Sequence, residues 1–259
     1  MGKNIHFHFV VIGTGGTGGH LITKLARFLN DFAKDGVSCE LSIVDGDMVE
    51  SKNIGRQPFT EDDLGVNKAV AFAENISYAL HYPVRAYGKF IEKESDLVEI
   101  MDNNACADSS YTEVIKVLIG CVDNHRARQV MEQWFQRHSY SSSYKFYIDS
   151  ANEFAVGEVV FSIYRSGKIV SPVRSSYFPE VLEPAKSVTE MSCEELNKVA
   201  PQHIVTNSFA SDIILSYITQ LCTCDNAINV LPGGINFFDS FKMFSRFDVR
   251  EVSNEKKVN

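Results

Sequence analysis

The residues with the clearest chemical meaning are glycines in a short loop near the N-terminus. Gly13, Gly15 and Gly18 satisfy the pattern Gly-x-Gly-x-x-Gly, and Gly16 lies between them. Glycine allows a tight turn and a close approach of phosphate to the backbone, while the helix that follows such a loop offers free N–H groups and the positive end of its dipole. The loop therefore predicts a nucleotide site, with NAD, FAD and ATP all open. A glycine-rich turn without a ligand is the alternative.

An acid follows where a nucleotide-binding fold needs one. Asp45 ends the second β-rich segment, at a place where a carboxylate can accept hydrogen bonds from ribose hydroxyls. The gap from the glycine loop exceeds the usual distance of roughly 20 residues, and the extra segment AKDGVSCE explains the difference. Taken alone, Asp45 is as consistent with a solvated acid in a turn.

Polar and charged side chains gather just past this acid. They are Asp47, Asn53, Arg56, Gln57 and Lys68. Arginine offers a planar fork to phosphate oxygens and lysine a mobile point charge, so together they can neutralise charge that develops on a leaving pyrophosphate. A dehydrogenase has no evident need for these polar and charged side chains, whereas a protein that binds a triphosphate does. The structural alternative is an exposed polar loop that leads into a helix.

The pattern of apolar residues predicts the elements that hold these side chains. Strands and helices alternate through the first half of the chain, which indicates a mostly parallel Rossmann-like α/β sheet with helices on both faces. The expected strands cover residues 5–12, 40–44, 84–87, 114–121 and 146–149, and the expected helices cover 20–33, 62–80, 94–103 and 124–137.

The second half has a different pattern. Residues 158–164 alternate like an antiparallel strand, and 236–247 alternate like one or two more strands. Between them we expect an irregular loop over about 171–191, of a length that is usually functional or mobile, and then a helix over 202–221. The sheet should therefore be extended by antiparallel strands in the C-terminal half.

Cys193 follows that long loop, in the capping-box pattern Ser192-Cys-Glu-Glu195. The first turn of a helix lowers the pKa of a thiol, so Cys193 could accept an acyl group as a thioester or acyl-persulfide. The alternative is a small buried residue at a helix start.

Composition limits the class of protein. The 259 residues contain no Pro/Gly/Ser-rich linker, which favours one domain over 1–259, with a nucleotide-binding half at 1–150 and an antiparallel and helical half at 151–259. A net charge of -8 disfavours a nucleic-acid surface. Six scattered cysteines and the lack of any apolar run of roughly 20 residues fit a cytoplasmic protein without a membrane span.

A family resemblance rests on these same residues. The run Val44-Asp45-Gly-Asp47-Met-Val49, continued by Asn53-x-x-Arg56-Gln57 and Gly65-x-x-Lys68-Ala69, resembles the signature of ThiF, MoeB, HesA and the ubiquitin-activating enzymes. Gly120-Cys-Val-Asp123-Asn124 with Arg128, and then Ile148-Asp149 and Gly157-Glu-Val, extend the resemblance into the second half. Details at Asn53–Gln57, Ser192-Cys193 and Gln202–Asn207 are most similar to the ThiF-like proteins of bacterial PRTRC systems.

The resemblance implies Mg²⁺-dependent adenylation by ATP. Gly13, Gly15 and Gly18 would shape the phosphate loop, and Asp45 would hold the ribose. Asn53, Arg56 and Lys68 would grip the triphosphate, and Asp123 would anchor the magnesium. The implied substrate is the C-terminal glycine of a small ubiquitin-like protein, and the relatives' habit implies a homodimer.

Several other functions stay open. The same chemistry could act on a small-molecule carboxylate or a tRNA-borne one. The glycine loop alone also fits an NAD-dependent oxidoreductase or a non-catalytic ATP-binding scaffold. Two departures from the family matter as well. Cys222-Thr-Cys224 is too little for a four-thiolate zinc site, so we expect no structural zinc. MoeB-like relatives also place an arginine from an N-terminal helix into the partner subunit's site, whereas here only Lys3 stands as a cation before the first strand.

Overall fold

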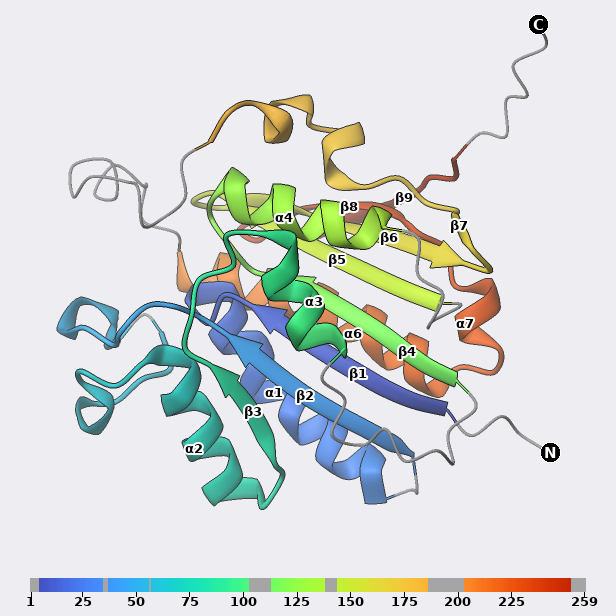
Figure 1. The fold of residues 1–259 in the computed structure, drawn as a ribbon. Coiled ribbons are helices and arrows are strands. Elements are labelled where there is room, and N and C mark those ends of the chain that lie inside the picture. The colour runs from blue at the N-terminus through green and yellow to red at the C-terminus, as the bar shows by residue number, and fades with distance from the viewer. Residues whose placement is uncertain are drawn as a thin grey trace, which may run out of the picture.

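The fold is described by a computed structural model over residues 5–34, 37–55, 57–102, 113–137, 144–185 and 203–252. Its centre is one nine-stranded sheet with the order β3-β2-β1-β4-β5-β6-β8-β9, to which β7 is added beside β6 (Figure 1). The strands are β1 (Ile5–Ile12), β2 (Ser38–Val44), β3 (Val84–Tyr87), β4 (Glu113–Gly120), β5 (Tyr144–Asn152), β6 (Val156–Arg165), β7 (Lys168–Ile169), β8 (Gly234–Asp239) and β9 (Phe244–Val249).

Helices cover both faces of this sheet. They are α1 (Gly16–Lys34), α2 (Lys68–Leu80), α3 (Glu94–Asp102), α4 (His125–Gln136), α6 (Ile204–Thr223) and α7 (Ala227–Val230). Short 3₁₀ helices lie between them: η1 (Ser51–Asn53), η2 (Glu61–Asp63), η3 (Arg174–Ser176) and η4 (Pro179–Leu182). None of the helices in the described part of the chain is long and apolar enough to cross a membrane.

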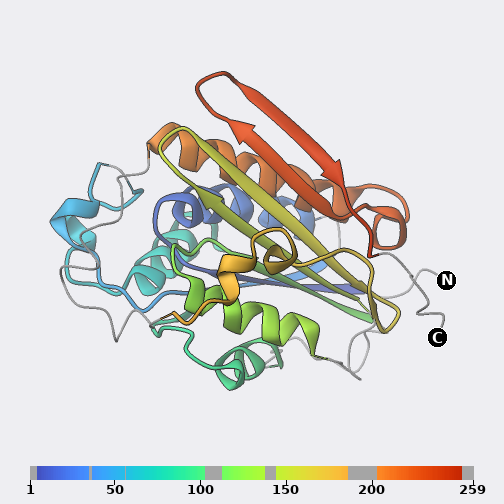
Figure 2. The same cartoon turned by 90° about the horizontal axis from the view of Figure 1, so that it is seen from above.

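The type of strand pairing changes once along the sheet, from parallel to antiparallel. The strands β3, β2, β1, β4 and β5 are parallel neighbours, whereas β6, β8 and β9 add in antiparallel fashion. Figure 2 shows the β8–β9 hairpin at the far edge, beside α6. The predicted fold class is confirmed. Because β1 has β2 on one side and β4 on the other, the strand order reverses there, and ligands of such sheets bind at the carboxyl ends of the strands at this point.

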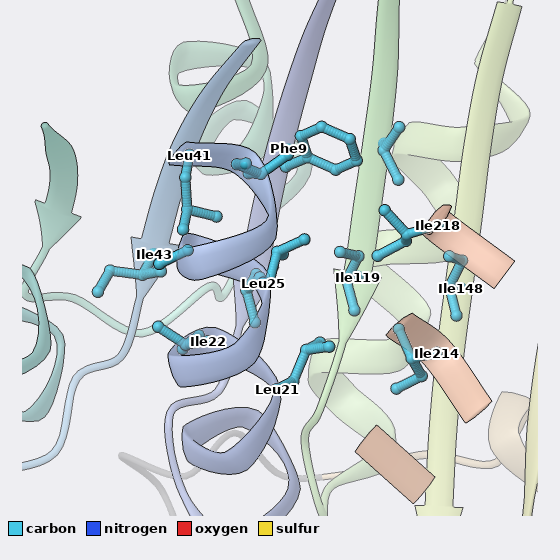
Figure 3. Close-up of a cluster of buried hydrophobic side chains, with 14 of the residues drawn as sticks. Phe9, Leu21, Ile22, Leu25, Leu41, Ile43, Ile119, Ile148, Ile214 and Ile218 are labelled. Atoms are coloured by element: carbon cyan, nitrogen blue, oxygen red, sulfur yellow. The ribbon is translucent and has the colours of Figure 1, made fainter. Parts of the chain in front are cut away.

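The alternation of side chains along β1 explains why the sheet needs helices on both faces. Phe7, Phe9 and Val11 point into a core shared with α1 and α6, whereas Val10 and Ile12 point into the core under α3 and α4. Figure 3 shows the first core, in which helix residues at i, i+3 and i+4 spacing meet the strands. The labelled side chains there are Phe9, Leu21, Ile22, Leu25, Leu41, Ile43, Ile119, Ile148, Ile214 and Ile218.

The bounds of several predicted elements differ from the structure, and two of the differences have a clear physical cause or consequence. The helix expected from residue 62 begins only at Lys68, because Gly65 has a φ of +77° and Asn67 caps the helix. The Asn67 side chain accepts hydrogen bonds from the backbone N–H groups of Ala69 and Val70. The loop expected over 171–191 contains η3 and η4 in its described part. Gln129 of α4 holds that part by donating to the carbonyl oxygens of Val181 and Glu183.

Candidate functional site

The glycine loop lies at the carboxyl edge of the sheet, between β1 and α1. A Cβ on Gly13 would lie 2.5 Å from the carbonyl oxygen of Cys121, and Gly13 has a φ of +89°. On Gly18 a Cβ would lie 1.9 Å from the carbonyl oxygen of Gly13. Both positions therefore need glycine for the loop to pack on the end of β4. Gly15 differs, since a Cβ there would meet only Gln57 Nε2 at 3.7 Å, so this part of the loop stays open to a ligand.

Asp45 lies against this loop at the end of β2. Its Oδ2 accepts hydrogen bonds from the backbone N–H of Thr14 at 2.7 Å and from Thr14 Oγ1 at 2.8 Å, and its Oδ1 accepts from the N–H of Asp47 at 2.8 Å. Burial raises the pKa of Asp45, while nearby Lys68 and the backbone hydrogen bonds oppose the rise. The carboxylate is thus fixed in position at the loop, and its predicted contact with a ribose stays a prediction.

Lys68 and Asp47 form an ion pair beside Asp45. Lys68 Nζ lies 3.0 Å from Asp47 Oδ2, and the lysine side chain is buried although the aspartate is half exposed. Asn67 fixes this geometry by donating to the carbonyl oxygens of Asp45 and Asp47. Sequence reasoning did not identify Asn67, because a capping asparagine cannot be told from a loop residue without the strand end that it contacts.

Two further residues predicted to bind the nucleotide, Asn53 and Gln57, lie at the end of η1 and just after it. Asn53 is buried, and its Oδ1 accepts a hydrogen bond from the backbone N–H of Glu50, which closes η1. Gln57 lies against the glycine loop through Nε2, and its buried Oε1 has no hydrogen-bond partner among the described residues. Arg56 lies outside the described residues.

Asp123 is exposed just past the end of β4, at the same edge of the sheet. The next residue, Asn124, caps α4 by accepting from the N–H of Ala127 at 2.8 Å. Within the described ranges no group of three or more His, Cys, Asp or Glu side chains could hold a metal ion. An ion at Asp123 would therefore need ligands from outside this set, such as phosphate oxygens and water.

Two described cysteines, one beside the glycine loop and one on α6, are poor nucleophiles. Cys121 packs against the glycine loop, and burial raises the pKa of its thiol to about 12. Burial also raises the pKa of Cys222 on α6. The predicted acyl acceptor, Cys193, lies outside the described residues. His125 begins α4 with its Nδ1 unpartnered among the described residues, and burial lowers its pKa.

A buried ionic cluster, missed by the sequence reasoning, lies on the α4 side of the sheet. Arg174 of η3 donates from Nε to the fully buried carboxylate of Asp149 and from Nη1 to Glu158 at 2.6 Å. Arg128 Nε lies 3.4 Å from the same Asp149 oxygen. We name Arg174, Asp149, Glu158 and Arg128 the Arg174 cluster. It fixes the start of the 171–185 segment to β5 and β6.

A model of the ThiF family matches residues 3–258. The chain belongs to the ThiF family. The family-level resemblance drawn from the sequence signature is thereby confirmed, while the narrower likeness to PRTRC-system proteins stays a prediction. A comparison with curated proteins gave no match.

Solved structures of two proteins resemble this ThiF-family chain. MccB of E. coli with ATP has a TM-score of 0.62 and 17% sequence identity, and the match covers 97% of this chain and 66% of that one. PaaA has a TM-score of 0.63 and 18% identity, with 95% of this chain and 64% of that chain covered. MccB has also been solved in complex with N-formylated MccA, with 16% identity and a TM-score of 0.62 over 97% of this chain and 67% of that chain. The chain thus corresponds to about two thirds of the length of these proteins, and the likeness shows the fold alone.

Proposed function

We propose that this ThiF-family chain binds ATP with Mg²⁺ and adenylates the C-terminal carboxylate of a small ubiquitin-like protein. A carboxylate oxygen attacks the α-phosphorus, the bond from that phosphorus to the bridging oxygen breaks, and pyrophosphate leaves with the electron pair. The first step needs no protein nucleophile, so the residues of the chain act by positioning and by charge stabilisation.

The observation that carries the proposal is a meeting of three features at one sheet edge. The open glycine loop, the partly buried acid Asp45 and the buried Lys68 lie together there, tied by hydrogen bonds to Thr14 and Asn67. Asp45 suits a ribose, and α1 offers its N-terminal N–H groups to phosphate. Lys68 supplies a cation that a dehydrogenase does not need. Arg56 and Asn53 complete the proposed triphosphate grip.

The chemistry of Asp123 fits a magnesium ion that is bound through the nucleotide. Mg²⁺ is commonly held by one or two carboxylates together with substrate phosphates and water. Asp123 is an exposed carboxylate with no ion-pair partner among the described residues, at the edge where phosphates would lie. When bound there, the ion would neutralise phosphate charge as pyrophosphate leaves.

The substrate is the finer part of the proposal. The family signature supports a carboxyl terminus, and MccB, with its partner MccA, is a relative of similar fold. A small-molecule or tRNA-borne carboxylate is the alternative, and the net charge of -8 argues against tRNA. We also propose later transfer of the acyl group to Cys193 with release of AMP, because the sequence pattern around Cys193 predicts a thiol in the first turn of a helix.

Calorimetry and isotope exchange test the proposal together. The purified protein should bind ATP in the presence of Mg²⁺ and should not bind NADH; tight NADH binding without ATP binding would overturn the adenylation proposal. ATP–pyrophosphate exchange should require a ubiquitin-like protein with its C-terminal glycine and should be absent when that glycine is deleted. Exchange with other carboxylates only would contradict the protein substrate and leave adenylation standing.

Variants then test the residues. Asp123→Ala and Lys68→Ala should each lower the exchange rate by about 100-fold or more, which corresponds to about 2.7 kcal/mol of transition-state stabilisation. Asp225→Ala and Lys34→Ala are matched controls, because both side chains are exposed. They lie at the C-terminal ends of α6 and α1, away from the proposed site at the helix N-termini. Unchanged exchange in both test variants would contradict the roles assigned to Asp123 and Lys68.

A further inference from the structure

Three polar residues from distant parts of the chain meet at the N-terminus of α1. Asn207 Oδ1, in the first turn of α6, accepts hydrogen bonds from Thr17 Oγ1 at 3.2 Å and from Asn152 Nδ2 at 2.8 Å. Thr17 lies in the first turn of α1, and Asn152 ends β5. Thr17 and Asn207 are both buried, with 5% and 4% of their surface exposed.

The network leaves one donor group of Asn207 unused. Because both contacts with Thr17 and Asn152 use Oδ1, the amide is oriented with its Nδ2 away from them. That nitrogen has no acceptor among the described residues, although Asn207 is more than nine-tenths buried. It lies directly on Gly16, where an added Cβ would be only 2.2 Å away. Gly16 is thus a glycine because Asn207 occupies the space of its side chain.

The position of this amide is electrostatically suited to an anion. Thr17 of α1 contacts Asn207 of α6, and further along both helices Lys24 contacts Ser211. The two helices therefore run in the same direction on the same face of the sheet (Figure 1). Their positive dipole ends therefore lie side by side at the carboxyl edge. Gly16 begins α1, whose first N–H groups have no partner within the helix. A phosphate at these N–H groups would face the amide of Asn207 as well.

We propose that Asn207 is a nucleotide-contacting residue whose Nδ2 donates a hydrogen bond to the α-phosphoryl group, and that Gly16 exists to admit it. The inference rests on the proposed function, since it assumes an adenine nucleotide with its α-phosphate at the start of α1. The α-phosphoryl oxygens are the ones that remain on the adenylate after pyrophosphate leaves. A donor at this place therefore holds both the ATP and the product, and it orients the phosphorus toward the incoming carboxylate.

Affinities for adenosine and AMP test this proposal without any carboxylate substrate. Adenosine lacks the phosphate, so the ratio of the two dissociation constants reports the contacts made to it. In Asn207→Ala the affinity for AMP should fall about 10-fold, since a hydrogen bond to a charged group is lost, while the affinity for adenosine stays within about twofold. Asn207→Asp keeps the volume and the acceptor for Thr17, yet places a negative charge at the phosphate, so AMP should bind about 100-fold more weakly.

Further variants separate a contact from a structural role. Ser211→Ala is the matched control, because Ser211 is a buried polar residue in the same α1–α6 contact, one turn further along α6. It should leave both affinities unchanged. Gly16→Ala should reproduce the loss of AMP affinity, because its Cβ displaces the amide of Asn207.

The outcomes distinguish this inference from the proposed function. If Asn207→Ala weakens adenosine and AMP equally, or weakens neither, Asn207 is only a structural link between the helices and the proposal is overturned. The same holds if the wild-type protein binds AMP no more tightly than adenosine. A wild-type protein that binds neither adenosine, AMP nor ATP would instead refute the proposed function itself.

Discussion

Replacement of Arg174 by methionine removes the cation at the centre of the Arg174 cluster, and we expect a large loss of stability. Arg174 is 3% exposed and Asp149 is fully buried, so water cannot take the place of the guanidinium. The variant leaves the Asp149 carboxylate with Arg128 alone, at 3.4 Å. Methionine keeps most of the side-chain volume, so the charge is the main change.

The magnitude follows from what stays behind. Breaking a buried ion pair by removal of one partner typically costs about 3–5 kcal/mol, because an uncompensated charge remains. Since Arg128 still faces Asp149, we expect a loss near the lower end, about 3 kcal/mol. The double variant Arg174→Met/Asp149→Asn should be more stable than Arg174→Met by about 1 kcal/mol or more, because it carries no unpaired carboxylate.

Urea unfolding of the wild type, the single variants and the double variant measures these differences. Lys89→Met is the control, because Lys89 pairs with the exposed Glu99 at the surface and such pairs contribute little to stability. Two results would refute the reasoning: a loss below about 1 kcal/mol in Arg174→Met, or a double variant no more stable than that single variant. Either would mean that water or another group takes the place of the guanidinium beside Asp149 in the variant.

Two further predictions concern buried basic side chains. Burial lowers the pKa of His8 from 6.5 to about 4, so between these pH values the unfolded chain binds a proton that the folded chain does not. The unfolding free energy should therefore fall by about 3 kcal/mol as the pH drops from 6.5 to 4, and urea titrations of His8→Leu should lack this component; an equal fall in both proteins would contradict it. Lys145, whose Nζ donates to the carbonyl oxygens of Phe135 and Arg137 at 2.6 Å each, closes the C-terminal end of α4. Lys145→Met leaves these carbonyls without that donor and should cost about 2 kcal/mol in urea unfolding, whereas a change within error would show that water replaces the ammonium.

The parts of the fold that the sequence predicts are those set by local patterns. The β-rich apolar run of β1 and the helical spacing in α1 are visible within ten or twenty residues, and the glycine loop lies between them. Asp45 was predicted to bind a ribose because it ends the second strand, and the structure shows that it also accepts a hydrogen bond from Thr14 of the glycine loop. The predicted start of α2 was wrong, because the acidic residues at 61–63 resemble a first helical turn but form the 3₁₀ helix η2.

The residues that the sequence does not reveal are joined by contacts between distant segments. Thr17 and Asn207 are 190 positions apart and meet only because α1 and α6 pack side by side. Arg174 pairs with Asp149 across 25 positions from within a segment that has no helical or strand periodicity. Neither pair leaves a pattern in a short window, and each member alone is consistent with a surface residue.

The Asp47–Lys68 pair explains how the proposed site can be prepared for phosphate in advance. An ammonium buried without a partner is costly, so a lysine kept for a triphosphate needs a counter-charge while the nucleotide is absent. Asp47 provides one at 3.0 Å, but its side chain is 50% exposed. The exposed carboxylate loses little when its partner turns to phosphate, because water solvates it again. Because the cation is buried and the anion is exposed, Lys68 can exchange Asp47 for a phosphate at little cost in free energy. Under the proposed function, Lys68 is held in place without being withheld from the nucleotide.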